Sequence, residues 1–524
     1  MAAIATPPPS QQARALDSAR APYPAALTAS APLLPPSPPR RQGARLGRAA
    51  AAAGLGLAVR WLVPIPEGIE PQAWSLFGFF IATVAGLVLE PVPAGAWALM
   101  CAGCALASHA LTFQEAFQAS DSQVLWLIVL SFFLAKGFEK TGLGERVAEM
   151  LVRSFGGSTL SLGLSLALGE ALLAPGMPST TARGAGIFVP VIKSVSAAAG
   201  SYPEDDASRH KIGAYLIQSQ LQASAHSSTM FLTAGAQNLL CLQLAESLGL
   251  DLGNHFLVWS QGALVPALLG TVLTPYLVYW LQPPTIKDTP EAPKAAAARL
   301  EQLGRLTQDE TVMLAAVGVA LTLWVFGDRL GVPPVVAAML AVGILVGAGV
   351  LDWRADCLRG TPQAWDTLFW FGVLISMSLC LQERGVIAAF TGWASGQLGA
   401  LHLPWPALFG ALHLQARGRG RGGFFLLHYL FASQTAHIGA LYTAFLSLMI
   451  AGGVPPKLAA LSLAYCVCLF GSTTHYASGQ AAVYVGSGFL SLKEVFVGGA
   501  VCGAAALALW GTAGMAWWKV LGWW

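Results

Sequence analysis

The stretch APGMPSTTAR occupies positions 174–183 of this chain, and a second stretch, SQTAH, occupies positions 433–437. Both contain Ser-x-Thr-Ala followed by a basic residue, and both lie in otherwise apolar surroundings. A polar break that occurs twice in an apolar chain indicates two half-sites that face one ligand. The basic fifth residues, Arg183 and His437, indicate that this ligand is an anion.

The composition is that of a membrane protein with many spans. Of the 524 residues, 55% are hydrophobic and 10% are charged, whereas about 25% of the residues in soluble proteins are charged. The apolar runs are too long for barrel strands, so we expect an all-α polytopic protein with about 11 to 14 membrane segments. The runs that fit are 73–89, 95–110, 124–134, 254–281, 312–326, 335–350, 368–381, 458–470 and 495–518.

Charge and cysteine content exclude other classes of protein. The net charge of +3 is too small to indicate a nucleic-acid partner. The eight cysteines are scattered, and their spacing predicts neither a disulfide framework nor a metal site. Cys101 and Cys104 lie within an apolar run, where a free cysteine behaves as a small hydrophobic residue.

The first 48 residues differ in kind from the rest. They are rich in Ala, Pro and Ser and contain six arginines but one acid, Asp17. Arg-rich, acid-poor segments of this kind are typical of organelle transit peptides. Prolines such as those at 7–9 disfavour a continuous amphipathic helix, which favours a plastid over a mitochondrion. We therefore predict a disordered plastid transit peptide at 1–48; a disordered cytosolic tail is the alternative.

The remainder divides into two halves that resemble each other. A charged segment at 283–310 separates a first membrane unit at 49–282 from a second at 311–524. The motifs KTG (140–142) and AGAQ (234–237) correspond to ERG (383–385) and ASGQ (477–480), and both pairs are offset by 243 positions. Internal repeats are typical of secondary transporters, commonly with inverted topology.

The two signatures are offset by 433 − 179 = 254 positions, which is 11 more than the other motifs. The Arg/Gly stretch at 416–423, before the second signature, and the hydrophilic loop at 202–211, after the first, account for this difference. Three arginines at the centre of a membrane helix would each cost a few kcal/mol. We therefore interpret 416–423 as a lineage insertion or an error in the coding sequence rather than a functional site.

The signatures carry the chemistry of an anion site. Pro175 and Pro178 interrupt the helix before the first signature, so Ser179, Thr180 and Thr181 stand where a new half-helix starts. Ser and Thr are good N-caps, and the exposed N–H groups of a helix N-terminus attract carboxylates. The alternative, in which Ser and Thr hydrogen-bond between packed helices, is less favoured when two motifs stand in matched halves. The second set is Ser433, Gln434 and Thr435.

Arg183 and His437 each stand four residues after the first serine, which places them on the same helix face. Arg183 could pair with a carboxylate, and His437 could donate a hydrogen bond or titrate. The alternatives are that Arg183 extends to the membrane interface and that His437 is a satisfied buried histidine.

A second polar break follows each signature, at 233–238 and at 471–480. Small, hydroxyl-rich and Gly-containing segments between apolar runs are candidates for unwound helix centres. We expect Thr474, His475 and Ser478 to contact the ligand. The residues expected to support it from the unwound segments are Gly235, Gln237, Asn238, Tyr476 and Gln480.

At these residues the chain resembles the divalent anion:sodium symporter superfamily, and within it the plastid dicarboxylate translocators, from about residue 59 to the C-terminus. The motifs that carry the resemblance are PQAW (71–74), LEP (89–91), PSTTARG (178–184), HYLFASQTAH (428–437) and THYASGQAAVY (474–484).

The resemblance implies two inverted repeats, each with a re-entrant hairpin and a broken helix, and a homodimer with a scaffold and a moving transport domain. The paired Ser-Asn-Thr signatures of the family bind the substrate carboxylates and map onto 179–181 and 433–435. Thr180 departs from the family, since Asn is usual there. The plastid members are sodium-independent exchangers, so neither a metal nor another cofactor is implied.

The sequence therefore predicts a multi-pass dicarboxylate antiporter of the plastid inner envelope that exchanges malate for 2-oxoglutarate, oxaloacetate or glutamate. Ser179, Thr181 and residues 433–435 would bind the carboxylates, while Arg183, His437 and His475 would balance their charge. One alternative is sodium- or proton-coupled uptake of dicarboxylate, sulfate or citrate. An intramembrane enzyme that uses Ser433 and His437 is disfavoured because no acid stands beside either signature. A further alternative is an anion channel.

Overall fold

The computed structural model describes residues 43–177, 179–390, 392, 404–413, 423–431 and 433–524. Residues Arg45–Trp524 form one compact unit. The expectations for residues 1–42 and for most of the Arg/Gly stretch lie outside the described residues. Within these residues all regular structure is helical, apart from a single bridge between Ser158 and Asp288. The all-helical membrane class expected from the composition is confirmed.

Six helical spans in the described residues are long and apolar enough to cross a membrane, or seven if one bent pair counts as a span. The bent pair joins Phe113–Asp121 to Gln123–Thr141 (α6) at 58°. The six spans are α3 (Pro71–Leu89), α14 (His255–Leu281), α16 (Gln308–Leu330), α18 (Pro362–Glu383) and two continuous rods, Gln434–Ala451 and Leu492–Val520.

The expected 11 to 14 segments thus exceed the full-length spans. Four further apolar helices have 10–17 residues: α4 (Ala94–Ala107), α8 (Thr159–Leu173), α17 (Pro334–Gly347) and Pro456–Ser472. Two of these, α8 and Pro456–Ser472, end at the polar breaks identified in the sequence.

The remaining labelled helices are shorter elements or segments of these spans: α22 and α23 belong to Gln434–Ala451, α24 to Pro456–Ser472, and α26 and α27 to Leu492–Val520. They are α2 (Leu46–Leu62), α5 (Phe113–Phe117), α7 (Leu143–Phe155), α9 (Thr180–Arg183), α10 (Val189–Ala198), α11 (Asp206–Arg209), α12 (Gly213–Met230), α13 (Ala236–Ser247), α15 (Glu291–Leu303), α20 (Trp405–His413), α21 (Phe424–Leu427), α22 (Gln434–His437), α23 (Thr443–Ala451), α24 (Pro456–Leu469), α25 (Gly479–Gly486), α26 (Leu492–Leu509) and α27 (Met515–Val520). Short 3₁₀ and π turns connect several of them.

The starts of corresponding helices are separated by the same 243 or 254 positions that separate the sequence motifs. Helices α12 and α24 begin 456 − 213 = 243 positions apart, as do α13 and α25 (479 − 236). Helices α9 and α22 begin 434 − 180 = 254 positions apart. Each of these two runs into a π turn, η3 (Gly184–Phe188) or η7 (Ile438–Tyr442), before it continues as α10 or α23.

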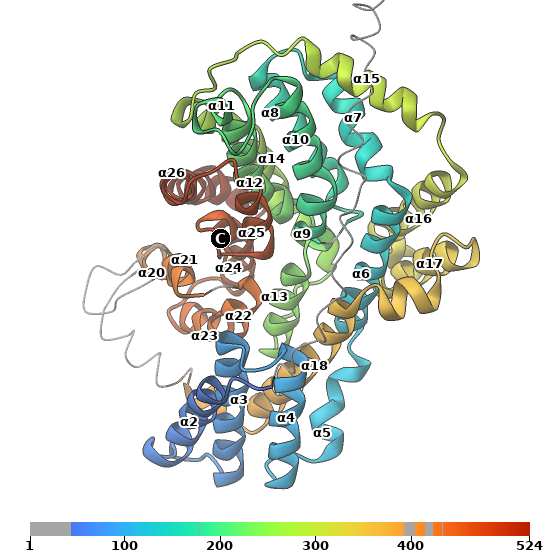
Figure 1. The fold of residues 1–524 in the computed structure, drawn as a ribbon. Coiled ribbons are helices and arrows are strands. Elements are labelled where there is room, and N and C mark those ends of the chain that lie inside the picture. The colour runs from blue at the N-terminus through green and yellow to red at the C-terminus, as the bar shows by residue number, and fades with distance from the viewer. Residues whose placement is uncertain (1–42, 178, 391, 393–403, 414–422, 432) are drawn as a thin grey trace, which may run out of the picture. The chain divides into compact units, whose positions relative to one another are not determined.

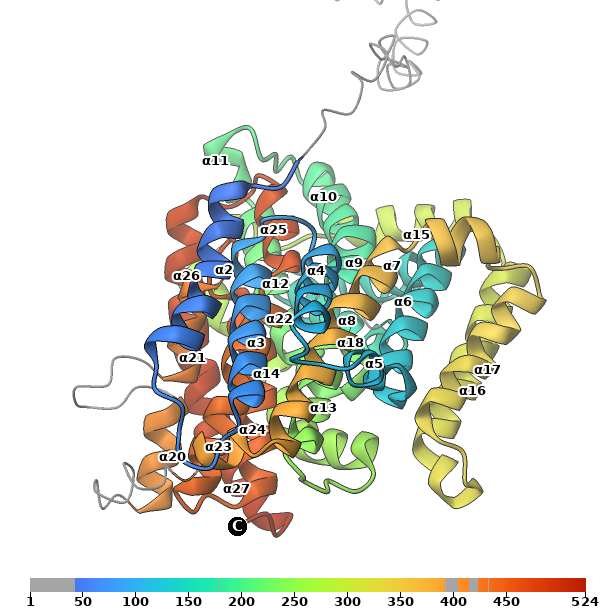
Figure 2. The same ribbon diagram turned by 90° about the horizontal axis from the view of Figure 1, so that it is seen from below.

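Helix α12 lies at the centre of the unit. All 18 of its residues are buried, although nine of them are Gln, Ser, His or Thr. It packs against α8, α14, α24 and α25. Figures 1 and 2 show α3, α4 and α18 side by side away from this centre, with α2 against α3 and α16 beside α17. A buried polar helix requires internal partners for its side chains, and several of these lie around the site described below.

The charged segment at 283–310 contains α15, which packs on α7. Arg146 of α7 anchors the end of this segment, since its Nε donates to Glu310 Oε1 at 2.6 Å and its Nη1 donates to Gly304 O at 2.8 Å. Glu310 is the last residue of the charged segment and lies in the first turn of α16, so one buried arginine holds α7 to the end of this segment and to the start of α16.

A second buried arginine connects the hydrophilic loop at 202–211 to the start of α26. Arg209 donates from Nη1 to Glu494 Oε2 at 2.6 Å and to Phe489 O at 3.0 Å. We expect Arg209→Ala to lower the thermal midpoint in detergent, because hydrogen bonds to charged groups contribute about 1.5–3 kcal/mol. Lys294→Ala is the control, since its pair with Glu291 is exposed on α15 and should contribute almost nothing. Equal midpoints for the two variants would contradict this assignment.

Candidate functional site

Four helix N-termini meet around one pocket of about 220 Å³. The helices are α9 and α22, which carry the two signatures, and α13 and α25, which follow the second polar breaks. Twelve residues line the pocket: Phe132, Ser179, Thr180, Thr181, Ala236, Gln237, Ser433, Gln434, Thr435, Ser478, Gly479 and Gln480. The fold therefore brings both signatures and both second breaks to the same place.

Three of the four helices are capped by a serine side chain. Ser179 Oγ accepts from Ala182 N at 3.2 Å, and Ser433 Oγ accepts from Ala436 N at 3.4 Å. Ser478 Oγ accepts from the third residue of its own helix, at 3.2 Å. The fourth helix, α13, starts after Gly235 without a side-chain cap. Each N-terminus carries a partial positive charge, so the pocket suits an anion although none of its lining residues is basic.

The threonines of the two signatures are placed differently. Thr435 Oγ1 lies 2.9 Å from Ser433 Oγ, so the second signature forms its own hydroxyl pair. Thr181 instead lies against α25, where a Cβ added at Gly479 would come within 2.6 Å of Thr181 Oγ1. The first signature thus contacts a helix of the second half, and glycine at 479 permits the approach.

This close approach gives a test. Gly479→Ala should displace Thr181 and weaken uptake of the expected dicarboxylate about tenfold, since overpacking a tight contact costs about 1–3 kcal/mol. Gly486→Ala, at the other end of α25, is the matched control because a Cβ there meets nothing within 4 Å. Concentration-dependent uptake into liposomes compares them. If both variants transport like the wild type, the contact between Thr181 and Gly479 has no part in the site.

The middle residues of the two signatures differ in their contacts. Gln434 Nε2 donates to Val467 O at 2.6 Å, and its amide lies over Gly471, where an added Cβ would meet it at 2.4 Å. Thr180 is buried at the equivalent position and has no side chain of that reach. The two signatures therefore differ both in the type of their middle residue and in the contacts that hold this residue in place.

Arg183 lies behind the pocket rather than in its lining. Its side chain is fully buried and pairs with Glu170 of α8, with 3.3 Å between Nε and Oε1. Its other N–H groups donate to Met177 O, to Ala234 O at 2.8 Å and to Ser228 Oγ at 2.8 Å. The guanidinium is thus turned toward protein partners.

His437 also lies outside the lining. Its ring packs against Phe424 and Phe470, with centroids 4.5 and 4.6 Å away. Its Nδ1 lies 3.4 Å from Nδ1 of His428, whose Nε2 contacts Ala477 O at 2.8 Å. The two histidines form a buried pair between aromatic rings.

The residues of the second breaks separate into two groups. Gln237, Gln480 and Ser478 line the pocket, and neither amide atom of the buried Gln480 has a hydrogen-bond partner within the described residues. Asn238 instead points into the protein and donates from Nδ2 to Ser228 O at 2.9 Å. Gly235 is the N-cap of α13.

Thr474, His475 and Tyr476 do not line this pocket. Tyr476 donates its hydroxyl to Tyr429 O at 3.0 Å, and the His475 ring packs against Tyr476 and Phe496. Thr474 is buried, and its Oγ1 has no partner among the residues that the structure describes. These three residues stand two to four positions before Ser478, the N-cap of α25.

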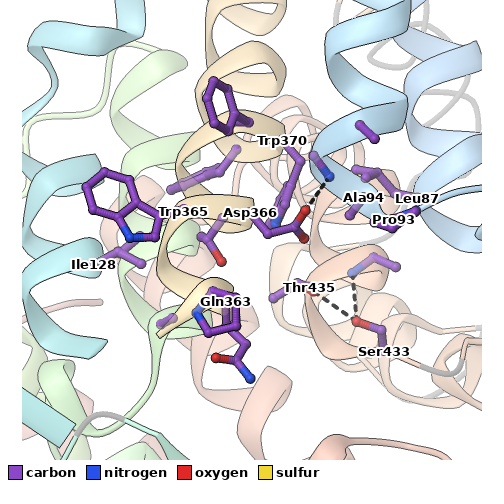
Figure 3. Close-up of a pocket in the computed structure, with 18 of the residues that line it drawn as sticks. Leu87, Pro93, Ala94, Ile128, Gln363, Trp365, Asp366, Trp370, Ser433 and Thr435 are labelled. Atoms are coloured by element: carbon purple, nitrogen blue, oxygen red, sulfur yellow. Dashed lines mark hydrogen bonds between the residues drawn. The ribbon is translucent and has the colours of Figure 1, made fainter. Parts of the chain in front are cut away.

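The pocket adjoins a larger cavity of about 830 Å³, and four residues line both: Phe132, Ala236, Ser433 and Thr435. Figure 3 shows this cavity between α18, the start of α4 and the second signature. Aromatic side chains of α18, such as Trp365 and Trp370, line it. Asp366 Oδ1 accepts from Gly95 N, in the first turn of α4, at 2.9 Å. The larger cavity therefore reaches the second signature.

The described residues contain no group of three or more His, Cys, Asp or Glu that could hold a metal ion.

The family described as "Sodium:sulfate symporter transmembrane region" matches residues 50–524. The chain belongs to the sodium:sulfate symporter family. This confirms the resemblance drawn from the motifs.

Known proteins that are similar to this chain agree with the family match. "Dicarboxylate transporter 2, chloroplastic" from Spinacia oleracea is 48% identical over 92% of this chain and 84% of its own length. "Dicarboxylate transporter 2.1, chloroplastic" from Arabidopsis thaliana is 50% identical over the same shares. Among solved structures, the YdaH transporter of Alcanivorax borkumensis superposes with a TM-score of 0.53 at 15% identity, over 80% of this chain and 89% of that one, which supports a shared fold.

The sequence analysis did not identify several residues whose side chains contact the residues of the site. Glu170 is an isolated acid within the apolar run 159–173, and that isolation was the available signal. Ser228 and Cys468 reach the site from α12 and α24; Cys468 Sγ donates to Asn238 Oδ1 at 3.0 Å. The contact of Cys468 joins positions 230 residues apart and that of Ser228 with Arg183 joins positions 45 apart, so no local pattern indicates them.

Proposed function

We propose that the chain is a secondary transporter that exchanges dicarboxylates, with malate as one partner and 2-oxoglutarate, oxaloacetate or glutamate as the other. The observation that carries this proposal is the meeting of four helix N-termini, two of them with hydroxyl signatures, around one pocket. A ligand with a carboxylate at each end matches two such half-sites. The names of the two plant relatives support this substrate class.

Residues 179–181 would hold one carboxylate, and residues 433–435 would hold the other. Hydroxyl groups and helix N-termini can bind carboxylates without a basic side chain in the pocket. Access would alternate by movement of a transport domain that contains the four N-termini against a scaffold that contains α3, α4 and α18. We also propose that the two units are inverted repeats with re-entrant hairpins at the signatures, that two chains form a homodimer, and that no covalent chemistry occurs.

We place the protein in the plastid inner envelope as a multi-pass membrane protein, with residues 1–48 as its transit peptide. The long apolar helices support the membrane part of this proposal. The word "chloroplastic" in the names of both relatives supports the organelle. Fusion of residues 1–48 to a fluorescent protein tests the address, and fluorescence confined to the cytosol would contradict it.

Counter-exchange in liposomes tests the function. Purified protein is reconstituted with internal malate, and uptake of labelled 2-oxoglutarate, oxaloacetate and glutamate is measured with and without external sodium. We expect saturable uptake that requires an internal dicarboxylate and is indifferent to sodium. Absence of exchange with every dicarboxylate would overturn the proposal, and uptake that never saturates would indicate a channel.

A second candidate is sodium- or proton-coupled uptake of dicarboxylate, sulfate or citrate. The family description, which names sodium and sulfate, favours it. The same liposomes distinguish the two candidates, because a symporter would accumulate substrate into empty vesicles when a sodium or proton gradient is imposed.

A further inference from the structure

The buried pair of Glu170 and Arg183 has no role in the function proposed above, yet it lies directly behind the pocket. Both side chains are fully buried, and Gln220 Nε2 donates to the second carboxylate oxygen of Glu170 at 2.6 Å. A buried charge is costly unless it is paired and hydrogen-bonded. Here each charge has its counter-charge and additional hydrogen bonds, so the pair is neutral as a unit.

Two of the groups that Arg183 contacts are backbone carbonyls that lie just before the N-cap of a pocket helix. Met177 O lies two residues before the N-cap of α9, and Ala234 O lies one residue before the N-cap of α13. Met177 lies in the connection between α8 and α9, Ala234 ends the 3₁₀ helix Leu232–Ala234, and both segments lead into helices of the pocket. A single guanidinium Nη1 thus bridges the two chain segments whose helices supply two of the four N-termini.

The second half makes the corresponding connection with different chemistry. His437 stands at 183 + 254, and Phe424, which packs on its ring, stands at 170 + 254. The carbonyl contacted by His428 belongs to Ala477, which stands at 234 + 243. The ion pair of the first half is therefore replaced by a histidine pair among aromatic rings, and the carbonyl before the helix N-terminus is held in both halves.

We propose that Arg183 is a positioning residue: with its charge neutralised by Glu170, it fixes the spacing between the N-termini of α9 and α13 and does not bind the substrate itself. This inference rests on the proposed dicarboxylate exchange. It explains why a cation adjacent to an anion site is turned away from the pocket. It also places the binding of the carboxylates on hydroxyls and helix N-termini alone.

The alternative roles make different predictions. If Arg183 bound the substrate, Glu170→Gln would release it from its partner and lower the KM for malate. If the pair were only a buried structural contact, removing both charges with Glu170→Gln plus Arg183→Gln would restore both stability and KM. If Arg183 positions the two helices, the double variant regains stability relative to either single variant, yet its KM stays high.

The experiment measures KM and maximal rate for malate exchange, together with thermal midpoints, for E170Q, R183Q, R183K and E170Q/R183Q. Groups that orient the ligands of a metal site are worth about 10- to 100-fold in affinity, and we expect a KM about tenfold higher in R183K and in the double variant. A KM within twofold of the wild type in the double variant, or a lower KM in E170Q, would overturn the proposal.

A matched control pair lies elsewhere in the chain. Arg146 and Glu310 form another buried ion pair, with 2.6 Å between Nε and Oε1 and with neither residue in the pocket lining. R146Q and R146Q/E310Q should change the thermal midpoint without changing KM. A KM in R146Q raised as much as in R183Q would show that loss of any buried pair has this effect, and would also overturn the assignment.

Hydrogen exchange separates failure of this inference from failure of the proposed function. Amides of residues 177, 179–183 and 232–238 should exchange faster in the double variant than in the wild type, without any substrate present. Wild-type protein that exchanges no dicarboxylate would overturn the function while this readout still decides the positioning role. Unchanged exchange in both segments would overturn the positioning role even in an active transporter.

Discussion

Thr181→Ala and Thr435→Ala are each expected to abolish dicarboxylate exchange while the protein still inserts and folds. Both threonines line the pocket at the first turn of a signature helix. Loss of either hydroxyl removes a donor to a substrate carboxylate and leaves the opposite half-site to bind alone. Because both carboxylates must be held for exchange, we expect uptake at the level of empty liposomes.

The contacts of the two threonines also predict a difference between the variants. Thr435→Ala leaves Ser433 Oγ without its partner at 2.9 Å, whereas Thr181→Ala removes a group packed against Gly479. Thr322→Ala is the control, since that hydroxyl is exposed on α16 and bonds to a carbonyl of its own helix. Uptake by T181A or T435A at the rate of T322A would exclude these hydroxyls from the site.

Gln434→Ala is expected to change which dicarboxylate is preferred. The Nε2 group of Gln434 is committed to Val467 O, and a carbonyl can only accept, so this contact fixes the orientation of the amide. Within the described residues no hydrogen bond involves its Oε1, which is left as an acceptor beside the pocket. An acceptor there favours a substrate with a hydroxyl donor, such as malate, over 2-oxoglutarate, which has none.

The expected result for Gln434→Ala is a fall in the ratio of malate to 2-oxoglutarate uptake by about tenfold, since one hydrogen bond contributes about 0.5–1.5 kcal/mol. Competition between the two labelled substrates measures this ratio directly. Thr180→Ala, at the equivalent position of the first half, should lower uptake of both substrates alike. A ratio that is unchanged in Q434A would show that the asymmetry of the two signatures does not select the substrate.

The parts of the site that depend on local chemistry could be predicted from the sequence. The serines at 179, 433 and 478 cap helices because Ser at an interrupted helix start accepts from the N–H two or three residues on. The offsets of 243 and 254 positions between motifs recur between the helix starts of the structure. Prolines and glycines at the breaks explain why α8 and α24 end where they do.

The contacts of individual polar residues could not be predicted in this way. Arg183 lies one turn from Ser179, as expected, yet its guanidinium points away from the pocket because Glu170 and Ala234 lie on that side. His475 and Tyr476 look like the richest polar pair of the second half, yet neither lines the pocket. Whether a side chain near a helix start faces the ligand depends on the neighbours that compete for it.

The sequence by itself determined that this protein is a helical membrane protein with two polar, helix-starting signatures in matched halves, because hydropathy and capping act over a few residues. Only the tertiary structure decided that four helix N-termini converge on one pocket and that the adjacent cation is neutralised behind it. The physical reason is that burial gives charged groups no solvent to pair with, so their partners are set by the packing of helices distant in sequence.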